Sequence, residues 1–159
     1  MTAVCLRMHK PRLNRLTRIH LKHPLYFLTL CTFQRKEILS EPTAHQAFVL
    51  FCEKAVVHGA FVGRYVLMPD HLHLFVSFTP AGVALSDWVK SLKNTLSKSW
   101  RSAGADAPHW QKGFFDHLMR SADSYEEKWN YVAANPVRAG LATSPEAWPY
   151  QGVIHEVFF

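Results

Sequence analysis

Two short apolar segments joined by a proline turn constrain the fold more than any other part of the sequence. Residues 61–68 and 71–78 are both rich in aromatic and β-branched side chains, and Pro69 and Asp70 stand between them. Because Pro69 cannot donate a hydrogen bond to a sheet, the chain turns at this point instead of continuing as one strand. The pattern therefore predicts a hairpin of two antiparallel strands.

The remaining elements are predicted from periodicity and from the residues that start and stop helices. Alternation predicts strands at 25–33 and 114–119, and apolar spacing predicts helices at 42–58, 85–101 and 124–135. Gly59 ends the first helix, a capping box of Ser124 and Glu127 begins the third, and Pro136 ends it. The order strand, helix, hairpin, helix, strand, helix predicts an α+β fold, with helices packed mainly on one face of an antiparallel sheet.

The two ends of the chain differ in composition from its centre. Residues 1–22 are expected to form a basic, loosely ordered arm, residues 23–142 the folded domain, and residues 143–159 an aromatic, irregular tail that packs over it. A hydrophobic content of 48% argues against disorder, and no apolar run reaches the roughly 18 residues of a membrane span. The three cysteines are too scattered for a disulfide framework, which favours reduced thiols in a cytoplasmic protein with no membrane partner.

Positive charge is concentrated towards the N-terminus. The first 36 residues carry eight basic and no acidic side chains, whereas the other 123 carry ten basic and twelve acidic ones. Such a segment favours a polyanion such as nucleic acid, and the alternative is a solvated arm with no specific partner. The candidates for DNA contact are arginines of the arm, lysines off the apolar face of the helix predicted at 85–101, and an aromatic residue expected to be exposed: Arg12, Arg15, Arg18, Lys90, Lys93, Lys98 and Trp110.

A pair of histidines on the second strand of the predicted hairpin is the first candidate for chemistry. Side chains alternate along a strand, so His71 and His73 point to one face and Leu72 to the other. Two imidazoles in this arrangement can chelate one metal ion, with the neighbouring Asp70 as a supporting group or a ligand. The alternative is a pair of surface histidines on a half-exposed strand.

The second candidate is a tyrosine that lies off the apolar stripe of its helix. In the helix predicted at 124–135, Tyr125, Trp129 and Val132 form the stripe, and Tyr131 lies on another side with Asn135 one turn beyond it. A free tyrosine phenol has a pKa of about 10 and is a weak nucleophile at neutral pH. A divalent cation at the histidines would favour attack on a phosphodiester, giving a 5′-phosphotyrosine link and a free 3′-hydroxyl.

The sequence resembles the REP-associated tyrosine transposases, which are a branch of the HUH single-tyrosine transposases. In the motif name HUH, H is histidine and U is a hydrophobic residue. The resemblance rests on three blocks in the family's order: residues 65–74 (YVLMPDHLHL), 110–117 (WQKGFFDH) and 131–141 (YVAANPVRAGL). The block that begins at Tyr26 and ends at Arg35 is similar as well. The resemblance covers about residues 20–142, and the three motifs together are far more specific than any one alone.

The resemblance implies several properties of the chain. It implies an RRM-like (ferredoxin-like) fold, Mg²⁺ or Mn²⁺ at His71 and His73, and Tyr131 as the nucleophile. The polar residue four positions after the tyrosine completes the metal site in the family, and here that residue is Asn135. The implied partner is single-stranded DNA near palindromic REP-type hairpins, in a bacterial, nucleoid-associated protein that is typically monomeric, although mobile relatives are dimers.

Two other functions remain open on the sequence. An RRM-like nucleic-acid-binding protein that has lost catalysis would share the basic arm, but it would not need Tyr131 or the histidine pair. A metal phosphodiesterase would use the histidines to activate water and would not form a covalent adduct. The complete set of His71, His73, Tyr131 and Asn135 argues against the first function. The absence of a metallohydrolase carboxylate cluster argues against the second.

Overall fold

A five-stranded antiparallel sheet forms the centre of the molecule. The computed structural model describes residues 18–20 and 23–158. The strand order is β5-β2-β4-β3-β6, and a separate two-stranded parallel sheet pairs β1 with β7. The strands are β1 (Arg18–His20), β2 (Leu25–Cys31), β3 (Ala60–Leu67), β4 (His71–Phe78), β5 (Phe115–Met119), β6 (Gln151–Val153) and β7 (Glu156–Phe158).

The predicted hairpin is confirmed as β3 and β4. These strands pair in antiparallel register up to Leu67 and Leu72, and the N–H of Met68 donates to the carbonyl of His71 at 2.8 Å across the turn. On its other side β4 pairs with β2 along the whole of that strand. The strand that carries His71 and His73 is therefore held from both sides at the centre of the sheet.

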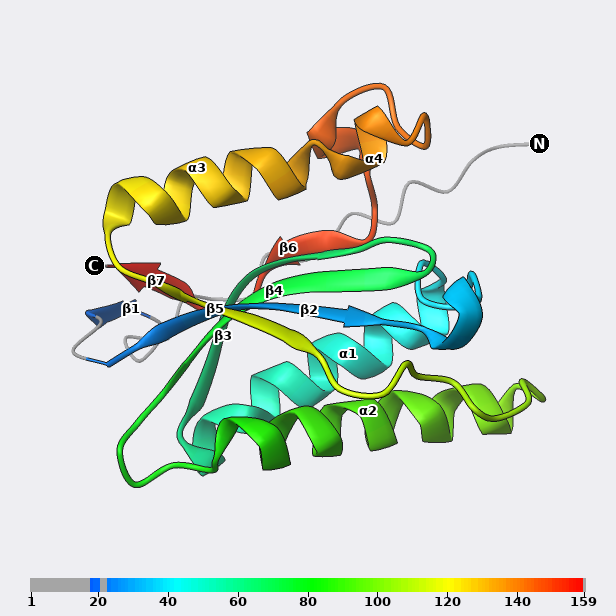
Figure 1. Cartoon of the computed structure of the whole chain (residues 1–159), viewed down its shortest axis with the longest axis horizontal. Coiled ribbons are helices and arrows are strands. Elements are labelled where there is room, and N and C mark those ends of the chain that lie inside the picture. The colour runs from blue at the N-terminus through cyan, green and yellow to red at the C-terminus, as the bar shows by residue number, and fades with distance from the viewer. Residues whose placement is uncertain (1–17, 21–22, 159) are drawn as a thin grey trace.

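Helices cover both faces of the sheet (Figure 1). The helices are α1 (Pro42–Lys54), α2 (Leu85–Ser102), α3 (Ala122–Ala133) and the short α4 (Asn135–Arg138), and the 3-10 turns are η2 (Phe33–Arg35), η3 (Ala55–His58) and η4 (Pro145–Ala147). The larger core lies under α1 and α2 and includes Leu72, Leu74 and Phe48. The smaller core lies under α3 and includes Phe75 and Tyr125. These layers confirm the predicted α+β class.

The end of α1 and the start of α3 differ from prediction. The helix predicted at 42–58 changes to a 3-10 turn at Ala55, and Gly59 then adopts a left-handed φ of 73°. The capping box predicted at Ser124 and Glu127 is wrong. The capping box is formed instead by Ser121 and Ser124. The Ser121 hydroxyl accepts from the Ser124 N–H, and the Ser124 hydroxyl accepts from the Ser121 N–H, so α3 starts at Ala122.

The irregular tail expected at 143–159 contains two strands, β6 and β7. Gly152 of β6 lies against the ring of Tyr65, where an added Cβ would come within 3.0 Å of the tyrosine hydroxyl. The indole N–H of Trp148 donates to the Leu67 carbonyl at 2.9 Å and holds the segment before β6 onto β3. The tail therefore completes one edge of the sheet. No helix within the described residues is long and apolar enough to span a bilayer.

Candidate active site

His71 and His73 lie side by side on the face of the sheet that α3 covers. Their ring centroids are 4.9 Å apart, and Leu72 between them is fully buried in the core on the opposite face. The Nδ1 of His71 is 2.6 Å from a carboxylate oxygen of Asp70, and the Nδ1 of His73 is 2.8 Å from the Thr29 hydroxyl. Neither Nε2 has a hydrogen-bond partner within the described part of the chain, so both remain available to a ligand.

Asp70 connects His71 to a cation on the preceding turn. Its second carboxylate oxygen is 3.1 Å from the Nε of Arg35. Gln34 and Arg35 have φ values of 50° and 57°, in the left-handed region that residues other than glycine seldom adopt. This backbone turn directs Arg35 back towards Asp70. The sequence identified Asp70 as a supporting residue but did not identify Arg35 or Thr29.

His73 is in the neutral form at physiological pH. Burial, together with the smaller effects of the nearby His71, Lys128, Arg138 and Arg35, lowers its pKa to about 3. Its ring stacks on Phe27, with centroids 5.3 Å apart. Only a neutral imidazole can donate its lone pair to a metal, so the surroundings of His73 favour the form that a metal needs.

The histidine pair fits a divalent cation, whereas a third ligand is not in place. Metal-binding histidines commonly hydrogen-bond a carboxylate or another polar group through the nitrogen that does not bind the metal, as His71 and His73 do here. Among the residues that the structure describes, no group of three or more His, Cys, Asp and Glu side chains is placed to hold a metal ion. A complete site would therefore need a different donor, such as the Asn135 amide oxygen or the substrate.

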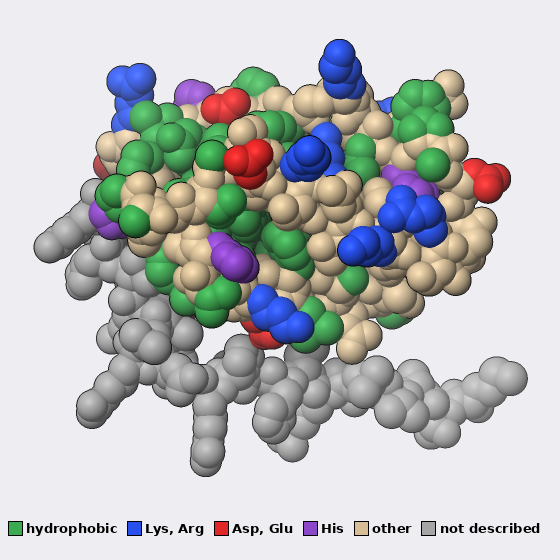
Figure 2. All heavy atoms as spheres, turned by 90° about the horizontal axis from the view of Figure 1, so that it is seen from below, with side chains coloured by type: hydrophobic (Ala, Val, Ile, Leu, Met, Phe, Trp, Pro, Cys, Tyr) green, Lys and Arg blue, Asp and Glu red, His purple; other side chains and the backbone are tan. Residues whose placement is uncertain are grey.

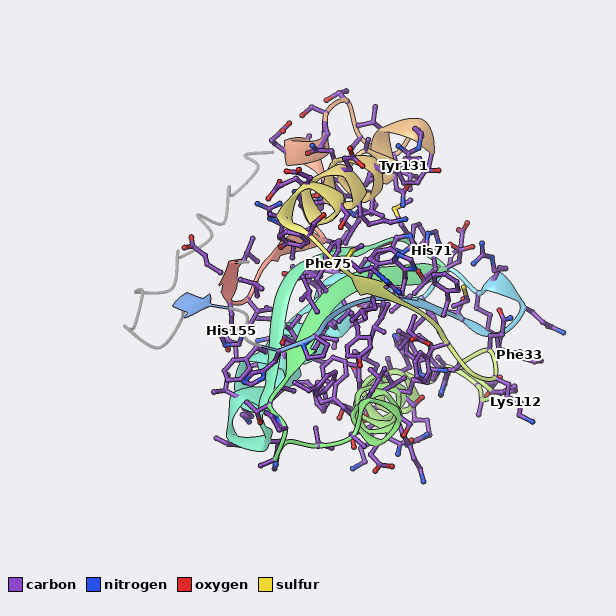
Figure 3. All side chains as sticks on the ribbon, turned by 60° about the vertical axis from the view of Figure 1, so that its left-hand side comes forward. Phe33, His71, Phe75, Lys112, Tyr131 and His155 are labelled. Atoms are coloured by element: carbon purple, nitrogen blue, oxygen red, sulfur yellow. The ribbon has the colours of Figure 1, made fainter. Side chains whose placement is uncertain are left out.

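Tyr131 lies on α3, on the same side of the sheet as His71 (Figure 3). Tyr125 and Val132 are buried under α3, whereas Tyr131 is 64% exposed, as the off-stripe position predicts. One turn before it, the Nζ of Lys128 lies 5.3 Å from the centre of the Phe27 ring, which stacks on His73. The side of α3 that carries Lys128 and Tyr131 therefore faces the histidine side of the sheet.

Arg138 contacts both Tyr131 and Asn135. Its guanidinium carbon is 4.1 Å from the centre of the Tyr131 ring, and its Nη2 donates to the Tyr131 carbonyl at 2.7 Å and to the Asn135 amide oxygen. The prediction that Pro136 ends the helix is wrong, because α3 ends at Ala133 and α4 then continues from Asn135 through Pro136. The sequence did not point to Arg138, although its position seven residues after Tyr131 places it on the same helical side.

Two of the residues predicted to bind DNA make hydrogen bonds within the protein. The Nζ of Lys93 donates to the carbonyls of Gln111 at 3.0 Å and Gly113 at 2.5 Å. Trp110, expected to be exposed, is half-buried. Its ring contacts Trp100 with centroids 5.1 Å apart, and its N–H donates to the Lys93 carbonyl at 3.0 Å. The expectation of an exposed ring is therefore wrong, because the ring covers the end of the α2 core.

Two further predicted DNA contacts lie away from the histidines. Lys90 and Lys98 are exposed on α2, which packs on the opposite face of the sheet from His71. On that face basic side chains are interspersed with hydrophobic and acidic ones and form no continuous patch (Figure 2). Arg12 and Arg15 lie outside the described residues, and Arg18 belongs to β1, where only the backbone is described.

Comparison with known proteins identifies the family. The model of the family described as "Transposase IS200 like" matches residues 21–135, which is more than half of the chain. The chain belongs to this family. The matched segment contains the histidine pair, Tyr131 and Asn135, so the resemblance to single-tyrosine transposases is confirmed at the family level.

Individual relatives of this IS200-like transposase agree with that assignment. A candidate REP-associated tyrosine transposase of Haemophilus influenzae is 23% identical over 101 residues, which cover 57% of this chain and 57% of that protein. The structure of a REP-associated tyrosine transposase bound to a REP hairpin superposes with a TM-score of 0.67 at 21% identity, over 84% of this chain and 79% of the other. A candidate transposase of Deinococcus radiodurans gives a TM-score of 0.52 at 24% identity, over 68% and 87%. The two structures show that the fold is shared.

Proposed function

We propose that this IS200-like transposase is a metal-dependent, single-tyrosine strand transferase that cleaves single-stranded DNA at or near REP-type hairpins. One observation carries the proposal. The two imidazoles on β4 are held in place by Asp70 and Thr29, and they lie on the side of the sheet that is covered by the helix carrying Tyr131. His71 and His73 would hold Mg²⁺ or Mn²⁺, and Asn135 would add an oxygen ligand. The bound cation would act as a Lewis acid towards the scissile phosphate.

The residues of the chain supply the nucleophile and much of the charge around it. The Tyr131 oxygen attacks the phosphorus, the bond from phosphorus to the 3′-oxygen breaks, and the phenol loses its proton as the departing 3′-oxygen gains one. The products are a 5′-phosphotyrosine and a 3′-hydroxyl. Arg138 on the Tyr131 ring and Lys128 one turn earlier provide positive charge where the phosphate would approach. The reaction is reversible because the phosphotyrosine link conserves the phosphodiester bond.

The structural relative supports a folded hairpin as the DNA partner. The structure of that protein contains a bound REP hairpin, and its fold matches 84% of this chain. The proposed assembly is a monomer acting on one hairpin, and the proposed location is the bacterial cytoplasm at the nucleoid. The concentration of positive charge in the first 36 residues suits contact with phosphates.

Adduct formation tests the proposal. A single-stranded hairpin library with labelled ends is incubated with the protein and Mn²⁺, and the products are separated on a denaturing gel. We expect a slower-migrating covalent adduct that Tyr131→Phe abolishes while hairpin binding survives. Tyr26→Phe is the matched control, because Tyr26 is a partly exposed tyrosine on β2 whose hydroxyl makes no hydrogen bond within the described residues.

Unchanged cleavage by Tyr131→Phe would refute the assignment of the nucleophile and favour a water-activating phosphodiesterase. Hairpin binding without any cleavage by the wild-type protein would favour a binding protein that has lost catalysis. His71→Ala tests the metal in the same assay, and normal cleavage by this variant in Mg²⁺ would make the histidines structural.

A further inference from the structure

A pocket opens beside the histidine pair on the same side of the sheet. It has a volume of about 340 Å³ and lies between Thr29 and Cys31 at the end of β2 and the segment 111–115. Thr29 forms part of its wall and also holds the Nδ1 of His73. This volume is at the lower end of the range of about 300–1,000 Å³ for small-ligand sites. The pocket is therefore adjacent to the proposed metal ligands and large enough for a flat ring.

Phe115 places an exposed aromatic ring at this pocket. It pairs with Thr29 across β5 and β2, so its side chain lies on the same face as Thr29 and His73. The residue is 60% exposed, and no aromatic ring of the described chain packs against it. A large exposed ring beside a candidate active site is a feature that stacking on an unpaired base would explain.

Two polar side chains line the pocket together with Phe115. The carboxamide of Gln111 and the ammonium group of Lys112 are exposed and make no hydrogen bond within the described residues. Figure 3 shows Lys112 on the loop at the outer edge of the molecule, near Phe33. A carboxamide can donate to and accept from a base edge, and an ammonium group can bind a phosphate.

The wall that carries these groups is fixed from behind. Lys93 donates to the carbonyls of Gln111 and Gly113, and the N–H of Gln111 donates to the Cys31 carbonyl at 3.0 Å. Gly113 adopts a φ of 76°, which a residue with a side chain rarely does. The pocket is thus held open before any ligand binds, which lowers the entropy cost of binding.

We infer that this pocket receives an unpaired DNA base that flanks the scissile phosphate. The base stacks on Phe115, its edge meets the Gln111 carboxamide, and the adjoining phosphate meets Lys112. This inference rests on the proposed function and deepens it, because it assigns the selection of the single-stranded flank to a site separate from the metal ligands.

Equilibrium binding without metal tests the inference apart from cleavage. All proteins carry Tyr131→Phe, and the probes are one hairpin with an unpaired flank, the same hairpin without the flank, and the flanked hairpin with abasic sites. Phe115→Ala should weaken binding of the flanked hairpin about 5- to 150-fold, the range that removal of one base stack produces, and leave the unflanked hairpin unchanged. Phe115→Leu keeps an apolar side chain but has no aromatic ring, so it should also lose the preference for the flanked hairpin over the unflanked one.

Leu118→Ala is the matched control, because Leu118 is a partly exposed apolar residue on the other face of the same strand. It should not alter either affinity. If Phe115→Ala loses affinity equally for both hairpins, or loses as much affinity for the abasic probe as for the flanked hairpin, the inference is overturned but the proposed function is not. A wild-type protein that forms the adduct but binds flanked and unflanked hairpins equally would also overturn it. Failure to bind any hairpin would overturn the proposed function as well.

Discussion

Asp70→Ala should separate metal binding from folding. The Asp70 carboxylate is the partner of the His71 Nδ1 at 2.6 Å and of Arg35 at 3.1 Å, so its loss frees the imidazole to rotate and to change tautomer. Removal of a supporting group of this kind typically lowers metal affinity about 10- to 100-fold. We expect the Kd for Mn²⁺ to rise by that factor, measured by calorimetric titration.

The same substitution should change stability little. Asp70 is 24% exposed and Arg35 is 57% exposed, and an ion pair this accessible contributes about 0.2–1 kcal/mol. The backbone stays anchored because the Thr32 N–H and hydroxyl both donate to the Asp70 carbonyl at 2.9 Å. In a chain of this size about 1 kcal/mol lowers Tm by about 2–4 °C, which calorimetry resolves.

Asp116→Asn is the control for general charge effects. Asp116 is an exposed carboxylate on β5, on the face opposite the histidines. This variant should bind Mn²⁺ as the wild type does. If Asp70→Ala binds Mn²⁺ normally, the argument that Asp70 orients His71 for metal binding is refuted. A Tm loss much above about 4 °C would show instead that the Asp70 carboxylate mainly supports the fold.

Two further predictions concern stability. Lys93→Met should lose two hydrogen bonds to carbonyls and lower the free energy of unfolding by about 1–3 kcal/mol in urea titration, whereas Lys90→Met, on the exposed side of the same helix, should change it little. Burial lowers the pKa of His155, whose Nδ1 donates to the Val62 carbonyl, so the unfolded chain binds the proton more readily. Stability should therefore fall as pH drops below about 6.5, and His155→Gln should flatten this dependence; an unchanged pH profile in that variant would contradict the assignment.

The parts of the fold that follow short-range patterns were predictable. Alternation around Pro69 gave the β3–β4 hairpin and placed His71 and His73 on one face, and helical spacing placed Tyr131 off the buried stripe of α3. Strand β6 was missed, because three residues carry little pattern and their pairing depends on the fit of Gly152 against Tyr65.

Contacts between distant segments were not predictable from one sequence. Thr29 meets His73 only because β2 pairs with β4, and Lys93 meets the 111–113 carbonyls only because the loop after α2 returns along its own helix. Position on the outer face of a helix suggested that Lys93 was free for DNA. Its interaction with two carbonyls shows that amphipathic spacing alone does not separate a solvated lysine from one that supports a loop.

The histidines and the tyrosine are held with different rigidity, which suits the two roles proposed for them. His71 and His73 lie on the central strand, their rings are fixed by Asp70 and Thr29, and the larger core lies beneath. Tyr131 lies on a helix attached to the sheet through the smaller core, and its ring lies against the exposed guanidinium group of Arg138. Because local stability follows buried apolar contact, the helix is the part that moves more easily. In the proposed mechanism, a fixed cation site with a more mobile nucleophile would allow the covalently held strand to leave the site and return to meet a new 3′-hydroxyl.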